Sequence, residues 1–241
     1  DLVVVSTAVE DTVEEVIKAK QLNIPIIKRA ELLAIIARSK KTIAVGGTSG
    51  KSTTSAMLFD ILQYAGMQPS IISGAGLTSI IKEGKIGNAK VGKGEWLVIE
   101  ADESDGSIVN YTPEIGLLLN IEKDHKEVDA LIDIFHKFKL NTKEFFAVNQ
   151  SQTIAGQLSH NHLHNFSIDK NDDAAFHATG FQQKGFSISF LINGVPFQLN
   201  SVGKHNMENV LAAATVANLI GVSLETSAEA IKQYEGIYRR H

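Results

Sequence analysis

The chain has 241 residues, of which 44% are apolar and 4 are proline, so it holds enough apolar material for one or two packed domains. Its 23 basic and 27 acidic side chains give a formal charge of -4 and occur in mixed order, which argues against the basic stripe of a nucleic-acid-binding protein. The absence of cysteine excludes a disulfide framework and thiolate metal sites, and it agrees with a soluble protein of the cytoplasm.

The first part of the chain alternates short apolar strands with helices. "DLVVVST" is a strand rich in β-branched residues, and "TVEEVIKAKQLN" after it has helical spacing; "IPII" and "AELLAIIARSK" repeat the pair. "KTIAV" begins a third strand, which runs into a glycine-rich loop. The helix after this loop is predicted over residues 51–64, with Gly66 as its C-terminal cap.

The same alternation continues beyond residue 90. "GEWLVIEADESDGS" contains a buried strand over 96–99 that ends in acids, and "EIGLLLNIEKDH" repeats this design. "LIDIFHKFKLNTK" is an amphipathic helix, and "EFFAVN" is a further strand. These elements predict the α/β class, with a doubly wound and mostly parallel sheet.

The pattern changes between residues 165 and 202. The short alternating runs "GFSISFLING" and "VPFQLN", which meet at Asn193-Gly194, predict a small antiparallel β subregion. Helices are expected again over 205–220 and 224–234. The longest uncharged run, 209–224, contains Asn, Thr and Ser and is too short to span a bilayer, so membrane insertion is not expected.

The glycine-rich loop has the composition of a phosphate-binding loop. In "AVGGTSGKSTTSAML", small residues would let successive backbone N–H groups converge on one anion at a helix N-terminus. Lys51 would neutralise the terminal phosphates, and the hydroxyl of Ser52 is placed to hold Mg²⁺. The usual pattern has glycine where this chain has Val45. The alternative is a glycine-rich turn with a solvated lysine.

Acidic and histidine side chains follow two further strands. Asp102, Glu103 and Asp105 come after "WLVIEA", and carboxylates there would suit Mg²⁺ beside phosphates. For Asp105, a solvated acidic turn that caps a helix is the favoured interpretation. His125 in "NIEKDH" lies past another strand end, where α/β sheets bind ligands.

Three alternating histidines in "SHNHLHN" would share one face of a strand, but a solvent-facing edge is the simpler interpretation. They are His160, His162 and His164.

Taken together, five ordered motifs resemble the Mur ligases, the ATP-dependent amide-forming enzymes of peptidoglycan synthesis. The motifs are "GGTSGKST", "EADESD", "NIEKDH", "GKHNMENVLAA" and "YEGIYRR". Mur ligases use a loop without the distant first glycine, so Val45 is ordinary for them. The resemblance extends over nearly the whole chain.

The resemblance implies roles for residues of each motif. Lys51 and the loop backbone would hold the β- and γ-phosphates of ATP, Ser52 and Glu103 would bind Mg²⁺, and His125 would ligate a second Mg²⁺. Lys51, Glu103 and His125 are thus the expected catalytic residues. The expected nucleotide-binding residues are Gly47, Thr48, Ser49, Gly50, Lys51, Ser52, Thr53, His205, Asn206, Asn209, Arg239 and Arg240. The segment at 205–209 would meet the adenine, because amide side chains suit the donor and acceptor edge of that base.

Within the family, the acidic motif and residues 7–33 are most similar to the branch that joins L-alanine to UDP-N-acetylmuramate. That reaction proceeds through an acyl phosphate, from which the incoming amine displaces phosphate. The alternative branch attaches a ready-made tripeptide to the same sugar nucleotide, and Ser49, where histidine is usual, leaves this choice open. Ser52, where threonine is usual, retains the hydroxyl. A folate or polyamide ligase and a nucleotide-binding module without ligase chemistry are further alternatives.

The resemblance also implies the domain organisation. Residues 1–40 are expected to be the end of an N-terminal domain that binds the UDP-sugar, and residues 41–241 a central ATP-binding domain. The chain opens on Asp1 and stops where a C-terminal amino-acid-binding domain would follow, so we expect it to bind ATP without completing the ligation.

Overall fold

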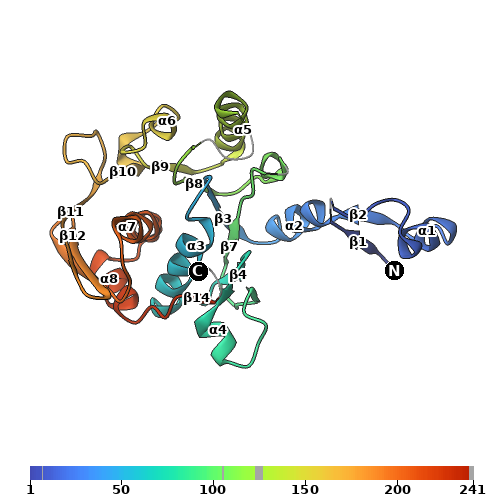
Figure 1. Ribbon diagram of the computed structural model, residues 1–241, viewed down its shortest axis with the longest axis horizontal. Helices are drawn as coiled ribbons and strands as arrows, with labels where there is room; N and C mark the ends of the chain where they lie inside the picture. The colour runs from blue at the N-terminus through green and yellow to red at the C-terminus, as the bar shows by residue number, and fades with distance from the viewer. Residues whose placement is uncertain (7, 105, 123–126, 239–241) are drawn as a thin grey trace.

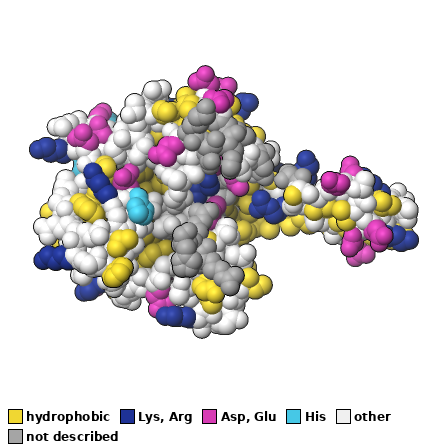
Figure 2. Space-filling view, in the orientation of Figure 1, with side chains coloured by type: hydrophobic (Ala, Val, Ile, Leu, Met, Phe, Trp, Pro, Cys, Tyr) yellow, Lys and Arg dark blue, Asp and Glu magenta, His cyan; other side chains and the backbone are white. Residues whose placement is uncertain are grey.

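A computed structural model describes residues 1–6, 8–104, 106–122 and 127–238. It contains a body and a protruding N-terminal arm (Figure 1). The arm consists of a parallel strand pair and two helices: β1 (Val3–Val5), α1 (Glu14–Gln21), β2 (Ile26–Lys28) and α2 (Arg29–Ala37). Figure 2 shows apolar side chains along the surface of the arm, and those exposed there include Leu2, Val4, Ile17 and Ile35.

A six-stranded sheet forms the centre of the body. All its neighbouring strands are parallel except the pair at one edge, so the predicted doubly wound sheet is confirmed. In spatial order the strands are β6 (Ala89–Lys90), β4 (Ser70–Ile72), β7 (Trp96–Glu100), β3 (Lys41–Gly46), β8 (Ile115–Leu118) and β9 (Phe145–Val148).

The apolar residues of β3 alternate between two cores because successive side chains of a strand point to opposite faces. Ile43 and Val45 join a large core with α3 (Lys51–Tyr64), α7 (Lys204–Leu219) and α8 (Leu224–Lys232). Ala44 joins the core on the other face, with α2, α5 (Val128–Asn141) and the 3₁₀ turn η1 (Ser107–Asn110). The sheet is thus covered by helices on both faces.

A second, four-stranded sheet packs on the far side of α7 and α8 (Figure 1). Its strands, in order, are β10 (Phe166–Ser167), β11 (Phe176–Lys184), β12 (Ser187–Ile192) and β13 (Val195–Leu199). The predicted hairpin at Asn193-Gly194 is confirmed, with φ of +46° and +86° at the two turn residues. The predicted antiparallel pairing is confirmed for β11 with β12 and for β12 with β13, whereas β10 pairs with β11 in parallel.

The remaining elements are short. They are β5 (Gly76–Leu77), α4 (Thr78–Lys82), α6 (Thr153–Gly156), the 3₁₀ turn η2 (His162–His164) and β14 (Ile237–Tyr238), which pairs with β5. In the described part of the chain, no helix has the length and apolar character needed to cross a membrane.

Candidate functional site

The loop between β3 and α3 is shaped by two glycines with positive φ. Gly47 has φ of +143° and Gly50, the residue before α3, has φ of +82°. A Cβ atom on Gly50 would lie 2.7 Å from Asn209 Oδ1, and one on Gly47 would lie 3.0 Å from Leu119 Cβ. Both positions therefore require glycine, for backbone conformation and for space. The backbone N–H groups of the loop lie at the N-terminus of the 14-residue helix α3, and this arrangement favours the binding of an anion.

The side chain of Asn120, two residues after the end of β8, holds the loop in place. Its Oδ1 accepts hydrogen bonds from the Ser49 N–H and the Thr48 hydroxyl, both at 2.9 Å. Its Nδ2 donates to the Ser49 carbonyl at 3.2 Å. Asn120 was not among the predicted site residues, because an asparagine that follows a strand is also a common turn residue.

Two of the predicted catalytic residues are in direct contact. The Lys51 ammonium lies 2.8 Å from Glu103 Oε2 and donates to the Gly47 carbonyl at 2.7 Å. The side chains are only 14% and 7% exposed, so this ion pair is largely shielded from solvent. The Lys51 ammonium therefore lies against the backbone of the loop, at the carbonyl of Gly47.

A second carboxylate, Glu100, lies against Ser52. Its Oε2 accepts from the Ser52 hydroxyl at 2.8 Å, and its Oε1 accepts from the Ser73 hydroxyl at 2.6 Å and the Gly74 N–H at 2.7 Å. Ser52 itself is fully buried. The sequence analysis assigned Ser52 to Mg²⁺ but did not single out Glu100.

One pocket of about 360 Å³ opens beside this cluster. It is lined by Arg29, Leu33, Thr48, Lys51, Ile72, Ser73, Gly74, Glu100, Asp102, Glu103 and Ser104. Partial burial acts to raise the pKa of Asp102, but hydrogen bonds from the Ser104 N–H and hydroxyl, with the charges of Lys51 and Arg29, outweigh it and lower that pKa. Asp102 therefore stays ionised at neutral pH.

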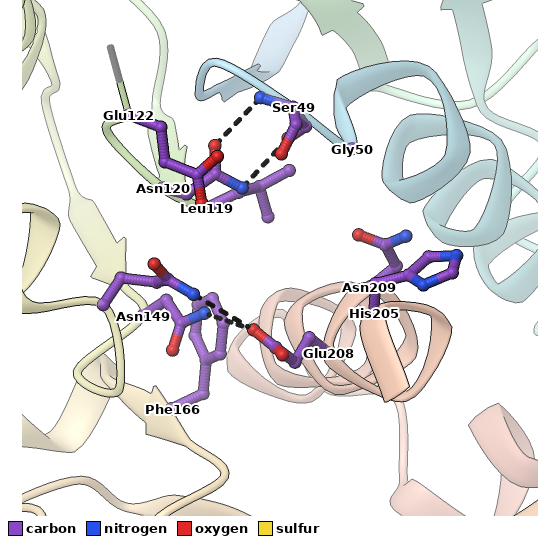
Figure 3. Close-up of a pocket in the computed structure, with 11 residues that line it drawn as sticks. Ser49, Gly50, Leu119, Asn120, Glu122, Asn149, Phe166, His205, Glu208 and Asn209 are labelled. Atoms are coloured by element: carbon purple, nitrogen blue, oxygen red, sulfur yellow. Dashed lines mark hydrogen bonds between the residues drawn. The ribbon is translucent and has the colours of Figure 1, made fainter. Parts of the chain in front are cut away.

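A second pocket of about 360 Å³ opens next to Ser49 and Gly50, so the loop separates two cavities (Figure 3). It is lined by Ser49, Gly50, Leu119, Asn120, Glu122, Asn149, Gln152, Phe166, His205, Glu208 and Asn209. Figure 3 shows the side chains reaching it from the loop, from α7 and from the segment after β9.

The predicted start of α7 lies at this second pocket, but its residues differ in position. His205 and Asn209 line the pocket, and Asn209 Oδ1 accepts from the Thr54 hydroxyl at 3.2 Å. Asn206 is not among the lining residues. Its amide donates to the Ser201 hydroxyl and the Val202 carbonyl, both at 2.8 Å, so it ties α7 to the preceding loop.

Thr53 is not among the described residues that line either pocket. Thr53 is half-buried in the first turn of α3. Asp105, His125, Arg239 and Arg240 lie outside the described residues, so their roles stay predictions.

The three alternating histidines do not share a strand face. Two of them belong to η2, and the His164 ring makes an edge contact with Phe145, with centroids 4.7 Å apart. Within residues 1–6, 8–104, 106–122 and 127–238, no group of three or more His, Asp or Glu side chains is placed to hold a metal ion.

Comparison with known proteins identifies a match to one protein family. The model of the Mur ligase middle domain matches residues 45–217. UDP-N-acetylmuramate–L-alanine ligases are 34% identical in Dictyoglomus turgidum and 36% identical in Geobacter sp. strain M21, over 100% of this chain and 53% and 54% of the relatives. The chain thus spans about half the length of these curated relatives.

Solved structures share the fold. UDP-N-acetylmuramate-alanine ligase MurC from Thermotoga maritima has a TM-score of 0.87 at 24% identity, over 99% of this chain and 56% of that one. A murein peptide ligase from Psychrobacter arcticus has a TM-score of 0.82 at 24% identity, over 99% and 56%. The loop, the two pockets around it and the family match over most of the chain lead to one conclusion: this chain belongs to the Mur ligase family.

Proposed function

We propose that this chain is the ATP-binding part of a ligase that joins L-alanine to UDP-N-acetylmuramate. The observation that carries the proposal is the loop at residues 46–52, which lies between two pockets with Lys51 on one side and Asn209 of α7 on the other. The curated relatives named for this reaction support the choice of substrates. The reaction consumes ATP and a sugar nucleotide, which assigns the protein to the cytoplasm.

In this proposal the nucleotide lies across the loop. The base occupies the pocket of His205 and Asn209, the phosphates accept from the loop N–H groups, and the γ-phosphate reaches the pocket that contains Lys51. The Lys51 ammonium would then exchange part of its contact with Glu103 for phosphate oxygens, since both are anionic acceptors.

The donor set around Ser52 fits Mg²⁺. This ion prefers hard oxygen ligands and is bound by one or two carboxylates together with substrate phosphates. The Ser52 hydroxyl and the carboxylates of Glu100 and Glu103 are the groups that would hold it. Bound there, Mg²⁺ would neutralise charge on the transferred phosphoryl group. A second ion at His125 stays part of the proposal, from family resemblance alone.

The chain's own residues would then favour attack of the substrate carboxylate on the γ-phosphate. Lys51 offsets the negative charge that gathers when a carboxylate approaches a phosphate. Among the residues that the structure describes, Arg29 and Lys51 are the cations that line this pocket, so the carboxylate is expected to approach between them. Attack of the carboxylate would release ADP and give an acyl phosphate. The amine of L-alanine would then attack the carbonyl carbon of that acyl phosphate, which forms the amide and releases inorganic phosphate.

The domain boundary at residues 40 and 41 belongs to the same proposal. Residues 1–40 include the protruding arm, and the family model begins only at residue 45. We infer that the arm is the end of the UDP-sugar-binding domain and that the 241-residue chain binds Mg-ATP without completing the ligation.

The test has two steps. Titration calorimetry of the chain with Mg-ATP should give saturable binding, which Lys51→Met weakens at least tenfold because a charge-assisted contact is lost. The full-length parent, given ATP, Mg²⁺ and UDP-N-acetylmuramate, should then release phosphate when L-alanine is added. Absence of ATP binding would refute the site, whereas ATP binding with no phosphate release would refute the substrates.

A second candidate is the ligase that attaches a ready-made tripeptide to UDP-N-acetylmuramate. Ser49 stands where histidine is usual in the L-alanine branch, which leaves the choice between the two branches open. Adding the tripeptide in place of L-alanine in the same phosphate assay separates the two. Phosphate release with tripeptide alone would select this second function.

A further inference from the structure

Glu208 occupies one wall of the pocket assigned to the nucleotide base. It stands in α7 one residue before Asn209, and its carboxylate reaches toward the segment that follows β9 (Figure 3). Two amides of that segment donate to it. Asn149 Nδ2 lies 3.2 Å and Gln152 Nε2 lies 3.5 Å from the same oxygen, Oε2.

The orientation of the Asn149 amide is set by its other contacts. Its Oδ1 accepts from the Ser151 N–H at 3.2 Å and the Ser151 hydroxyl at 2.6 Å, and the residue is only 3% exposed. The Nδ2 donor therefore faces Glu208. Both donors thus engage Oε2, while Oε1 accepts no hydrogen bond from the described residues.

We propose that Glu208 determines which base the pocket accepts, by presenting Oε1 as an acceptor to the amino group at the 6-position of adenine. This inference rests on the proposed ATP site. An ionised carboxylate can only accept hydrogen bonds. A purine with a carbonyl at the 6-position would bring two acceptors together and leave both unpaired in a half-enclosed site, which costs affinity.

The amide clamp makes the substitution Glu208→Gln informative. The glutamine oxygen would take the place of Oε2, because Asn149 and Gln152 both supply donors there. Its NH₂ group would then occupy the Oε1 position and donate into the pocket. This change converts the acceptor at the 6-position into a donor while side-chain size and the link to Asn149 are kept.

Titration calorimetry with three nucleotides tests the proposal. They are ATP, purine riboside triphosphate with hydrogen at the 6-position, and inosine triphosphate with a carbonyl there, each with Mg²⁺. The native chain should bind them in this order of decreasing affinity, with about tenfold or more between the first and the last. Glu208→Gln should lower the ATP-to-inosine-triphosphate affinity ratio at least tenfold, and Glu208→Leu should bring the ratio close to one.

Glu229→Gln is the matched control. Glu229 is exposed on α8 and is not among the residues that line either pocket, so its substitution removes the same charge without altering the acceptor beside Asn149. The affinity ratio should stay as in the native chain even if both affinities rise. An equal shift of the ratio in both variants would assign the effect to net charge and overturn the proposal.

The outcomes separate this inference from the function on which it rests. If the native chain binds none of the nucleotides, the proposed ATP site fails. If it binds ATP and the ratio is unchanged in Glu208→Gln, Glu208 only links α7 to the segment after β9, and the inference fails. Should that variant not fold, similar affinities of the native chain for all three nucleotides would refute the proposal equally.

Discussion

Alanine at Gly50 should damage both stability and nucleotide binding. Gly50 has φ of +82°, and an alanine side chain in this left-handed region costs about 1–2 kcal/mol. The added Cβ would also lie 2.7 Å from Asn209 Oδ1, and overpacking of a filled site costs a further ~1–3 kcal/mol. We therefore expect Gly50→Ala to lower the free energy of unfolding by about 2–5 kcal/mol. Because Asn209 lines the base pocket, its displacement should weaken Mg-ATP binding by about tenfold or more.

Gly66 offers a matched control on the same helix. It has φ of +76°, but a Cβ there meets no atom within 4 Å. Gly66→Ala should therefore cost only the ~1–2 kcal/mol of backbone strain and leave Mg-ATP affinity as it is. Urea unfolding and titration calorimetry on both variants supply the comparison. Equal losses of stability together with native Mg-ATP affinity in Gly50→Ala would refute the argument that Asn209 needs the space at Gly50.

Three further changes test other parts of the structure. Asn120→Ala removes the hydrogen bonds that hold Thr48 and Ser49 and should weaken Mg-ATP binding about tenfold. Asn120→Asp should weaken Mg-ATP binding more, because a negative charge then faces the phosphates. Native affinity for Mg-ATP in both variants would contradict the role given to Asn120. Burial raises the pKa of Asp60 from 3.8 to about 6, against a hydrogen bond from Ser79, so the stability it contributes is full below about pH 4 and is lost as pH rises through 6. Asp60→Asn should exceed the native chain by ~2–3 kcal/mol in urea unfolding at pH 8 and match it near pH 4, and a constant difference would refute this. Phe138→Ala opens the core beneath α5, where Phe138 meets Phe146 edge-on, and should cost ~3–5 kcal/mol in urea unfolding, whereas a loss below 1 kcal/mol would show that the core closes over the space.

Much of the fold could be predicted because local pattern and tertiary structure agree. The loop glycine and the cap at Gly66 bound a helix, and α3 runs over Lys51–Tyr64 as predicted. The run "KTIAV" became a central strand because its apolar residues supply both faces of the sheet. The hairpin at Asn193-Gly194 follows from the ease with which both residues adopt positive φ.

The contacts that complete the two pockets come from distant parts of the chain. Asn120 clamps a loop that lies 71 residues earlier, and the Asn149 amide meets Glu208 59 residues later. Their proximity depends on strand order, in which β8 lies beside β3 and β9 beside β8. Local sequence pattern does not determine that order. An asparagine after a strand is equally common as a turn residue, so its type alone carried no signal.

The position of Glu100 could have been predicted from the sequence, because successive side chains of a strand point to opposite faces of the sheet. Trp96 and Val98 join the core that contains α3, whereas Leu97 and Ile99 join the opposite core. Continuing the alternation by one residue puts Glu100 on the α3 face, where the Ser52 hydroxyl donates to it. The predicted site residues were instead the acids that follow the strand, since α/β sheets bind ligands at the carboxyl ends of their strands. A charged residue at the end of a buried strand is therefore a stronger candidate for a site residue than the acids in the loop that follows. The sheet determines the face to which its side chain points, whereas the direction of a loop side chain depends on a loop conformation that the sequence does not give.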